Sequence, residues 1–135
     1  MTRNWLRATA MVLALWVGSL GQPALADGQS AKPSNKWRIE VDHTSVNAGK
    51  LVFRITPVQG TPTDVSVSVA EKEHENKIAQ NIRDALAAQL PTDRYTVELD
   101  DGEDVLIKRQ SGQPDFLVEL SSTNVKGTTL EVERE

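Results

Sequence analysis

Residues 71–91 read EKEHENKIAQNIRDALAAQLP, and their apolar positions recur at the spacing of an amphipathic α-helix. The apolar stripe consists of Ile78, Ile82, Ala85, Leu86 and Leu90. Acidic residues at positions 71, 73 and 75 suit the positive end of a helix dipole, and Pro91 cannot continue a helix. The stretch therefore predicts one helix over residues 71–90, and the segments on either side show a different periodicity.

Before the helix, three segments alternate apolar and polar residues, which is the pattern of half-buried β-strands. Their apolar positions are Trp37, Ile39, Val41, Leu51, Phe53, Ile55, Val65, Val67 and Val69. Pairing Val41 with Leu51 places the apolar residues of the first two segments on one face. Pairing Ile55 with Val65 does the same for the second and third. The pattern predicts a three-stranded antiparallel meander.

After the helix, four more segments have strand character, namely Tyr95–Leu99, Glu103–Lys108, Asp115–Leu120 and Thr128–Glu133. A three-residue loop over residues 100–102 pairs Val97 with Val105 and puts Gly in the third loop position. The next hairpin then pairs Ile107 with Phe116. In the last segment, the apolar residues match the face of the segment before it. These residues predict a second meander.

The element order is βββαβββ(β), which predicts an α+β fold with one amphipathic helix across an antiparallel or mixed β-sheet. Residues 36–135 form this single domain. Residues 27–35 are rich in Gly, Ser, Lys and Pro without an apolar pattern, which is typical of a flexible leader.

Residues 1–26 have the three zones of a cleavable signal peptide. Arg3 and Arg7 give a positive start, residues 8–20 are mostly apolar, and Ala24-Leu25-Ala26 is a small-x-small cleavage pattern. The apolar zone is shorter than the ~20 residues of a membrane-spanning helix. We expect cleavage after Ala26, a periplasmic or secreted protein, and no stable membrane insertion after cleavage.

The composition restricts the class of partner. The chain has 15 Lys and Arg against 19 Asp and Glu, with a net charge of −4 and no Cys. Loss of the signal peptide removes two arginines and no acid, which leaves a more acidic domain. Non-specific nucleic-acid binding is therefore not expected, because carboxylates repel phosphates. The absence of Cys excludes disulfides, thiolate catalysis and Cys-based zinc sites.

Acidic residues surround Gly102 over residues 100–104, which raises the question of a calcium loop. An EF-hand loop needs a Glu at its twelfth position, and counting from Asp100 that position is Ser111. The turn propensity of Asp and Gly accounts for these residues without a metal. We interpret the segment as the solvated tip of a hairpin.

The two histidines are His43 and His74. His74 has a carboxylate one turn away at Glu71, which is one way to begin a metal site. An exposed, polar helix start is the simpler interpretation. No catalytic motif accompanies either histidine, so we predict no catalytic, cofactor-binding or metal residues, and a protein that is not an enzyme.

The resulting expectation is an exported, non-enzymatic domain that binds another exported or envelope protein. Val52, Leu106 and Leu117 are apolar residues on the outward side of their strands, and if they cluster they would mark a partner patch or a second packing layer. One alternative is a secreted enzyme inhibitor that uses the loops Asn47–Lys50 or Asp100–Glu103. A metal-binding protein that uses the histidines and acidic residues is a further alternative.

Overall fold

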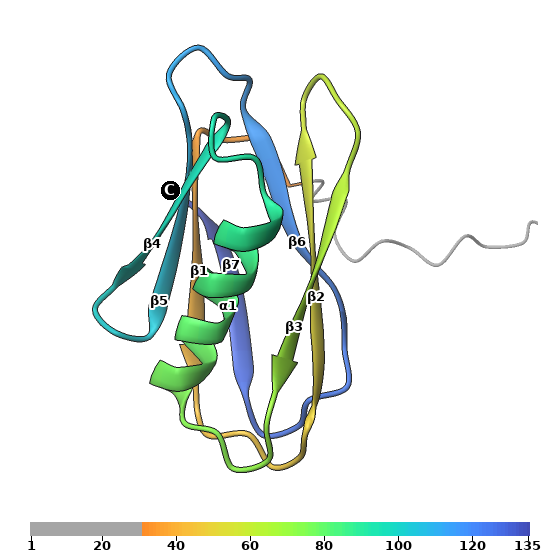
Figure 1. The fold of residues 1–135 in the computed structure, drawn as a ribbon, viewed down its shortest axis with the longest axis vertical. Coiled ribbons are helices and arrows are strands. Elements are labelled where there is room, and N and C mark those ends of the chain that lie inside the picture. Colours follow the sequence, from red (N-terminus) through yellow and green to blue (C-terminus); the bar gives the residue numbers. More distant parts are fainter. Residues whose placement is uncertain (1–30) are drawn as a thin grey trace, which may run out of the picture. The chain divides into compact units, whose positions relative to one another are not determined.

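The computed structural model describes residues 31–135, and the predicted signal peptide lies outside the described residues. The fold is α+β in the order βββαβββ(β), as predicted (Figure 1). Its elements are β1 (Lys36–Asp42), β2 (Gly49–Pro57), β3 (Thr63–Val69), α1 (Glu75–Gln89), β4 (Tyr95–Asp100), β5 (Asp104–Arg109), β6 (Phe116–Thr123) and β7 (Thr129–Arg134).

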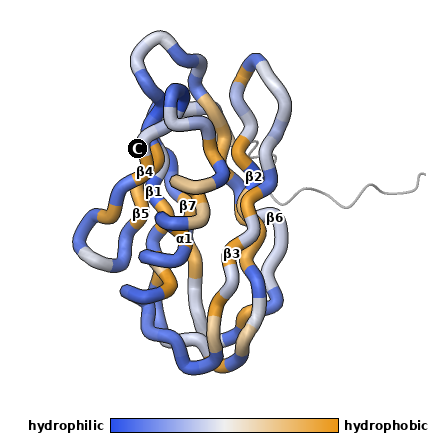
Figure 2. Tube along the Cα trace, viewed as in Figure 1, coloured by the Kyte–Doolittle hydropathy of each residue, from blue (hydrophilic) through white to orange (hydrophobic). Residues whose placement is uncertain are grey.

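The strands divide between two antiparallel sheets with the orders β4-β5-β1-β7 and β3-β2-β6. Their apolar sides face one another, and α1 packs against strands of both sheets, β3 of the smaller one and β1, β4 and β5 of the larger (Figure 1). The alternation of apolar and polar residues along β2 and β3 is visible in Figure 2. The helix thus joins β3 to β4 and covers the side of the core between these two edge strands.

The core lies between the two sheets and the helix. Its largest fully buried side chains are Phe53, Phe116, Ile39, Leu51, Ile55, Ile78, Ile82, Leu86 and Ile107. Two contacts bridge the sheets at Phe116: the Trp37 indole N–H donates to its carbonyl at 2.7 Å, and the ring of Tyr95 lies edge-on to it at 5.0 Å. The core therefore holds together strands far apart in the sequence.

Helix α1 confirms the predicted apolar stripe but begins at Glu75, four residues later than expected. Ile78, Ile82 and Leu86 are fully buried. The preceding residues form a turn in which Lys72 has a left-handed φ of 57°. The carboxylate of Glu73 accepts the backbone N–H of Ala70 at 2.7 Å. The turn thus uses Glu73, which the sequence assigned to the helix, while Glu75 begins the helix itself.

The predicted pairing of β1 with β2 is wrong. Strand β1 pairs with β5 and β7, with Ile39 opposite Val105 and Val132, while β2 pairs with β3 and β6. The predicted hairpin between β5 and β6 is wrong for the same reason, since β6 belongs to the other sheet. Periodicity shows which side of a strand is buried, but it does not show which strand lies beside it.

Two predicted hairpins exist with a register shifted by two residues. Phe53 lies opposite Val65, and Val97 lies opposite Ile107. The three-residue β4–β5 loop is consequently residues 101–103 rather than 100–102. A shift of two keeps every side chain on its predicted face, so the apolar pattern does not distinguish the registers.

Two residues that the sequence placed at the end of the leader contact the domain. Ser34 exchanges two backbone hydrogen bonds of 3.0 Å with Phe116, and the carbonyl of Asn35 accepts the Arg109 N–H at 3.0 Å.

Among residues 31–135, no helix is both long and apolar enough to cross a membrane.

Candidate functional site: the acidic face of the larger sheet

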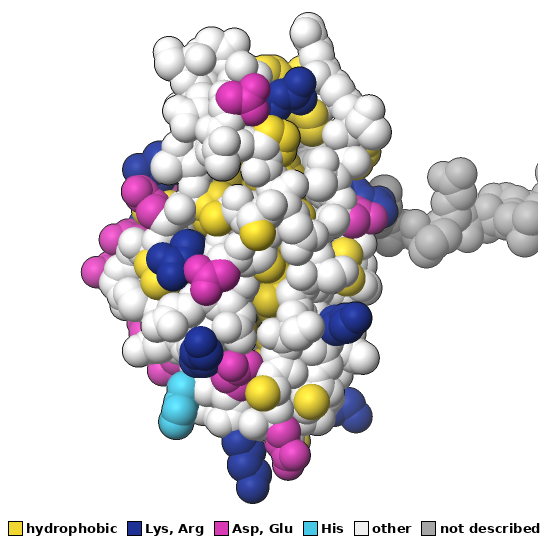
Figure 3. Space-filling view, viewed as in Figure 1, with side chains coloured by type: hydrophobic (Ala, Val, Ile, Leu, Met, Phe, Trp, Pro, Cys, Tyr) yellow, Lys and Arg dark blue, Asp and Glu magenta, His cyan; other side chains and the backbone are white. Residues whose placement is uncertain are grey.

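The outward face of the β4-β5-β1-β7 sheet is rich in carboxylates. The strand registers place on it Glu98, Asp100, Asp104, Glu40, Asp42, Glu131, Glu133 and Glu135, against the basic residues Lys36, Arg38 and Lys108. In Figure 3, acidic side chains gather along the margin of the molecule beside β4 and β5. We call this surface the acidic face.

Arg38 lies at the centre of the acidic face and binds three carboxylates. Its guanidinium donates to Asp100 at 3.1 Å, to Glu135 at 2.5 Å, and to Asp104. These hydrogen bonds, with Glu135 contributing most, raise the pKa of Arg38 and lower the pKa of Glu135. One cation therefore joins the β4–β5 hairpin to the C-terminal residue.

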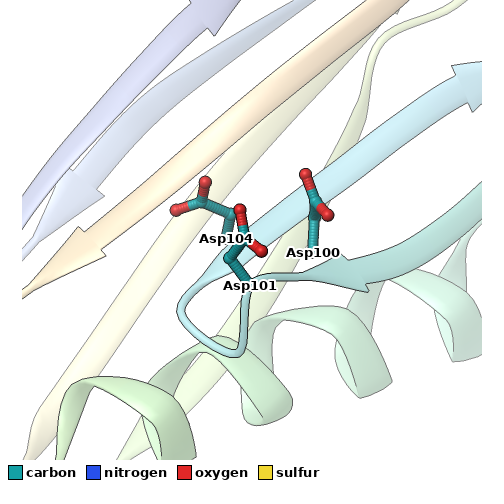
Figure 4. A group of neighbouring side chains, drawn as sticks. All are labelled: Asp100, Asp101 and Asp104. Carbon is teal, nitrogen blue, oxygen red and sulfur yellow. The ribbon is translucent and has the colours of Figure 1, made fainter.

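The acidic tip of the β4–β5 hairpin forms a compact group of carboxylates (Figure 4). Oxygens of Asp100, Asp101 and Asp104 lie within 4.8 Å of one another. Two of the three carboxylates already bind the guanidinium of Arg38, which supplies the positive charge that they attract. Arg38 thus accounts for the clustering of Asp100 and Asp104, and the group gives no separate reason to assign a cation.

Glu40, Glu131 and Glu133 belong to the same face but form no ion pair with Arg38. Glu40 is directly opposite Asp104 on one side and Glu131 on the other. The Asp104 carboxylate raises the pKa of Glu40 above its ordinary value of 4.5, and desolvation and the carboxylates of Glu131, Glu133 and Asp42 act in the same direction. Within residues 31–135, no basic side chain forms an ion pair with Glu40, Glu131 or Glu133. Like charges directly opposite on neighbouring strands destabilise a sheet.

Replacing Glu40 by Gln is expected to give a small increase in stability at pH 7. The raised pKa means that the folded chain holds this proton more tightly than the unfolded chain, so stability falls as pH rises past 4.5. The gain should therefore disappear below pH 4.5, where Glu40 is protonated in both the folded and the unfolded wild-type chain. Urea unfolding at several pH values measures it. Glu119→Gln is the control, because Glu119 lies opposite Arg54 and its loss should bring no gain.

The two histidines lie near the end of β1 and the start of α1. His43 has a φ of 69°, and its backbone N–H donates to the Glu75 carboxylate at 2.9 Å. His74 is the residue before α1, and its Nδ1 lies 3.4 Å from the hydroxyl of Thr44. Neither histidine belongs to a group of three potential metal ligands among the described residues. Their observed contacts tie the loop after β1 to the helix.

The two loops considered for enzyme inhibition differ in their surroundings. The Asn47 side chain donates to the Asn124 carbonyl at 3.0 Å, and the Lys50 N–H donates to the Asn124 side chain at 2.7 Å. This loop is therefore held against the neighbouring β6–β7 loop. The β4–β5 loop lies at the margin of the view in Figure 1 and is held against β1, where the Glu103 carbonyl accepts the Val41 N–H at 3.2 Å.

The outward apolar residues do not form one patch. Leu106 lies on the acidic face, opposite Arg38 and Glu98, and is only 5% exposed. Val52 and Leu117 lie on the other sheet, where Leu117 is opposite Thr56, four positions along β2 from Val52. The suggested apolar partner patch is therefore wrong, and Leu106 instead packs among the charged side chains of the acidic face.

Two small pockets flank Tyr95, whose pKa is raised by burial. One of about 140 Å³ is lined by Pro57, Gln59, Arg94, Tyr95, Gln113 and Pro114. The other, of about 290 Å³, is lined by Ala87, Leu90, Thr92, Tyr95, Thr96, Val97 and Gln110. Neither lining contains His, Asp or Glu, and Tyr95 is the titratable side chain that the two linings share.

The sequence reasoning did not identify Arg38, Glu40 or Glu131 as members of a common surface. Their outward positions follow from strand periodicity, but only the sheet order brings them together. No protein-family model matches the chain, and comparison with curated proteins finds no match.

Proposed function

We propose that this chain is a small exported, non-enzymatic module that binds a basic partner protein through the acidic face. The observation that carries the proposal is the row Asp104, Glu40 and Glu131, three carboxylates directly opposite one another across three strands. Asp104 is neutralised by Arg38, while Glu40 and Glu131 have no ion-pair partner within residues 31–135.

A basic partner would relieve the repulsion in this row. Complementary charge accelerates association and favours partners of the opposite sign. The neighbouring Glu133 and Asp42 extend the negative potential along β7 and the end of β1. Nucleic acid is an unsuitable partner because its phosphates have the same sign of charge as this surface. An envelope or secreted protein with a basic surface fits both the charge and the export signal.

The test uses the full chain, produced in a bacterial host, with an epitope inserted after Gly112. This loop position is suitable because a Cβ on Gly112 would have nothing within 4 Å. N-terminal sequencing of the extracytoplasmic fraction should find a chain that begins at Asp27. Capture from the same fraction should recover a basic protein at low salt, with less recovered as ionic strength rises.

Two variants decide whether the acidic face is responsible. Replacing Glu131 and Glu133 by Gln should reduce capture, whereas Glu119→Gln on the smaller sheet should leave it unchanged. An unprocessed chain in the cytoplasmic fraction would refute export. Equal capture by all three proteins would refute the role of the acidic face.

A further inference from the structure

Strand β7 has one unpaired edge. Successive residues of an antiparallel strand direct their backbone groups to alternate sides. The Glu135 N–H donates to the Lys36 carbonyl at 3.1 Å, so the odd-numbered positions bond to β1. Leu130, Val132 and Arg134 direct their N–H and C=O groups away from β1, where no strand of residues 31–135 pairs with them.

The other sheet edges are covered at least in part. Helix α1 packs against β3 and β4, and its side chains cap backbone carbonyls of β3. Asn81 donates to the carbonyl of Ser68 at 3.5 Å, and Gln89 donates to that of Ser66 at 3.3 Å. The start of β6 is paired with Ser34, and the rest of its outer edge pairs with no strand of residues 31–135. In the described part of the chain, the outward groups of β7 have no such hydrogen-bonding cover, and a free strand edge is a template for another strand.

The side chains of β7 define what would fit beside it. Leu130 and Val132 face the core but are only partly buried, whereas Glu131 and Glu133 are exposed on the acidic face. A strand added here would have side chains on two faces. On the core side they would lie beside Leu130 and Val132, and on the acidic face they would lie beside Glu131 and Glu133.

A second copy of this chain is a poor occupant. In a two-fold antiparallel pair centred on Val132, each Glu131 lies opposite a Glu133 of the other copy. Four carboxylates would then face one another directly, and such pairs are destabilising. Lys or Arg at these positions would instead form cross-strand ion pairs with Glu131 and Glu133.

We propose that the edge of β7 binds, by strand addition, an extended partner segment in which Lys or Arg alternates with apolar residues. This inference rests on the proposed function and specifies the chemistry of the basic partner. The backbone hydrogen bonds supply part of the affinity, and the alternation of charge and apolarity selects the register.

The test uses two synthetic peptides of about six residues, the usual strand length, with identical composition. In one, Lys alternates with Val; in the other, the Lys residues precede the Val residues. Fluorescence anisotropy should show that the processed protein binds the alternating peptide roughly tenfold more tightly than the block peptide. Binding should also slow hydrogen exchange at the amides of Leu130, Val132 and Arg134.

Two variants separate the contributions of backbone and charge. Val132→Pro removes an outward N–H without removing a hydrogen bond to β1, and should abolish the preference for the alternating peptide. The double variant Glu131→Lys and Glu133→Lys leaves the backbone intact and should weaken binding roughly tenfold or more. The comparison matched for charge uses single variants: Glu119→Lys, on the smaller sheet, should bind more strongly than Glu131→Lys.

The possible failures are distinguishable. Equal binding of both peptides without slowed exchange in β7 would overturn strand addition and leave charge-driven binding by the acidic face in place. Binding of neither peptide would also overturn it, while the capture experiment decides the broader proposal separately. A dimer in sedimentation that is lost in the Val132→Pro variant would assign the edge to a second copy instead.

Discussion

Replacing Phe53 by Ala is expected to lower the free energy of unfolding by about 3–5 kcal/mol. Phe53 is fully buried at the middle of β2, with Val65 opposite it on β3 and Leu120 opposite it on β6. Its ring belongs to the core between the two sheets, and the neighbouring strands cannot close the resulting cavity completely. Urea unfolding followed by circular dichroism measures the change.

The control for this substitution is Val58→Ala, a few residues further along the same hairpin. Val58 is 58% exposed, so its truncation should change stability by less than about 0.5 kcal/mol. Phe53→Leu keeps most of the apolar volume and should give an intermediate value if Phe53→Ala does not fold. A loss below about 1 kcal/mol for Phe53→Ala would mean that the core is not built around this ring.

The buried side of most strands could be predicted from the sequence because it depends only on a period of two. The alternating residues of β1, β2 and β3 are all buried as predicted, and so is the stripe of α1 apart from Ala85, which is partly buried. These assignments need no knowledge of neighbouring strands. They are enough to establish an α+β fold with a helix on a sheet.

Strand partners could not be predicted in this way because every apolar strand face is compatible with every other. The meander interpretation favoured neighbours in sequence, whereas β1 lies between β5 and β7. One overlooked signal bears on register. Arg54 and Asp64 are directly opposite in the observed β2–β3 pairing, and their side chains lie 2.8 Å apart. The predicted register would have separated these charges.

The acidic face could not be predicted for the same reason. Its members come from strands between Lys36 and Glu135, and they become neighbours only through the order β4-β5-β1-β7. The carboxylates around Gly102 were recognised as a hairpin tip, but their contact with Arg38 was not expected. Arg38 looks like any outward residue of a strand until β5 is placed beside it.

One end of the domain is formed by three loops that bond to one another. Ser45, after β1, donates its N–H to the Glu73 carbonyl at 3.0 Å, and its carbonyl accepts the Lys72 N–H at 3.1 Å. The Val46 N–H donates to the Lys126 carbonyl at 2.7 Å, which joins the β6–β7 loop to the same cluster. The Lys126 contact lies just before β7, so we expect that loosening this cluster would also loosen the start of β7, which is the proposed binding edge.

Replacing Gly127 by Ala is expected to lower the free energy of unfolding by about 2–4 kcal/mol. Gly127 has a φ of +88°, a conformation that disfavours any residue with a Cβ. An added Cβ would also lie 2.6 Å from a methyl carbon of Val46 and 2.9 Å from the backbone carbonyl of Thr44. The β1–β2 and β6–β7 loops would have to separate, and thermal and urea unfolding would both detect the loss.

Gly112→Ala isolates the effect of this crowding. Gly112 has a similar φ of +83°, but a Cβ there would meet nothing within 4 Å. Its replacement should therefore lose only the conformational part, about 1–2 kcal/mol. Equal losses at the two positions would show that the loops do not press on Gly127. A larger loss at Gly127, with faster hydrogen exchange at Thr129 and Glu131, whose amides face β1, would show that the loop cluster holds the start of β7 in place.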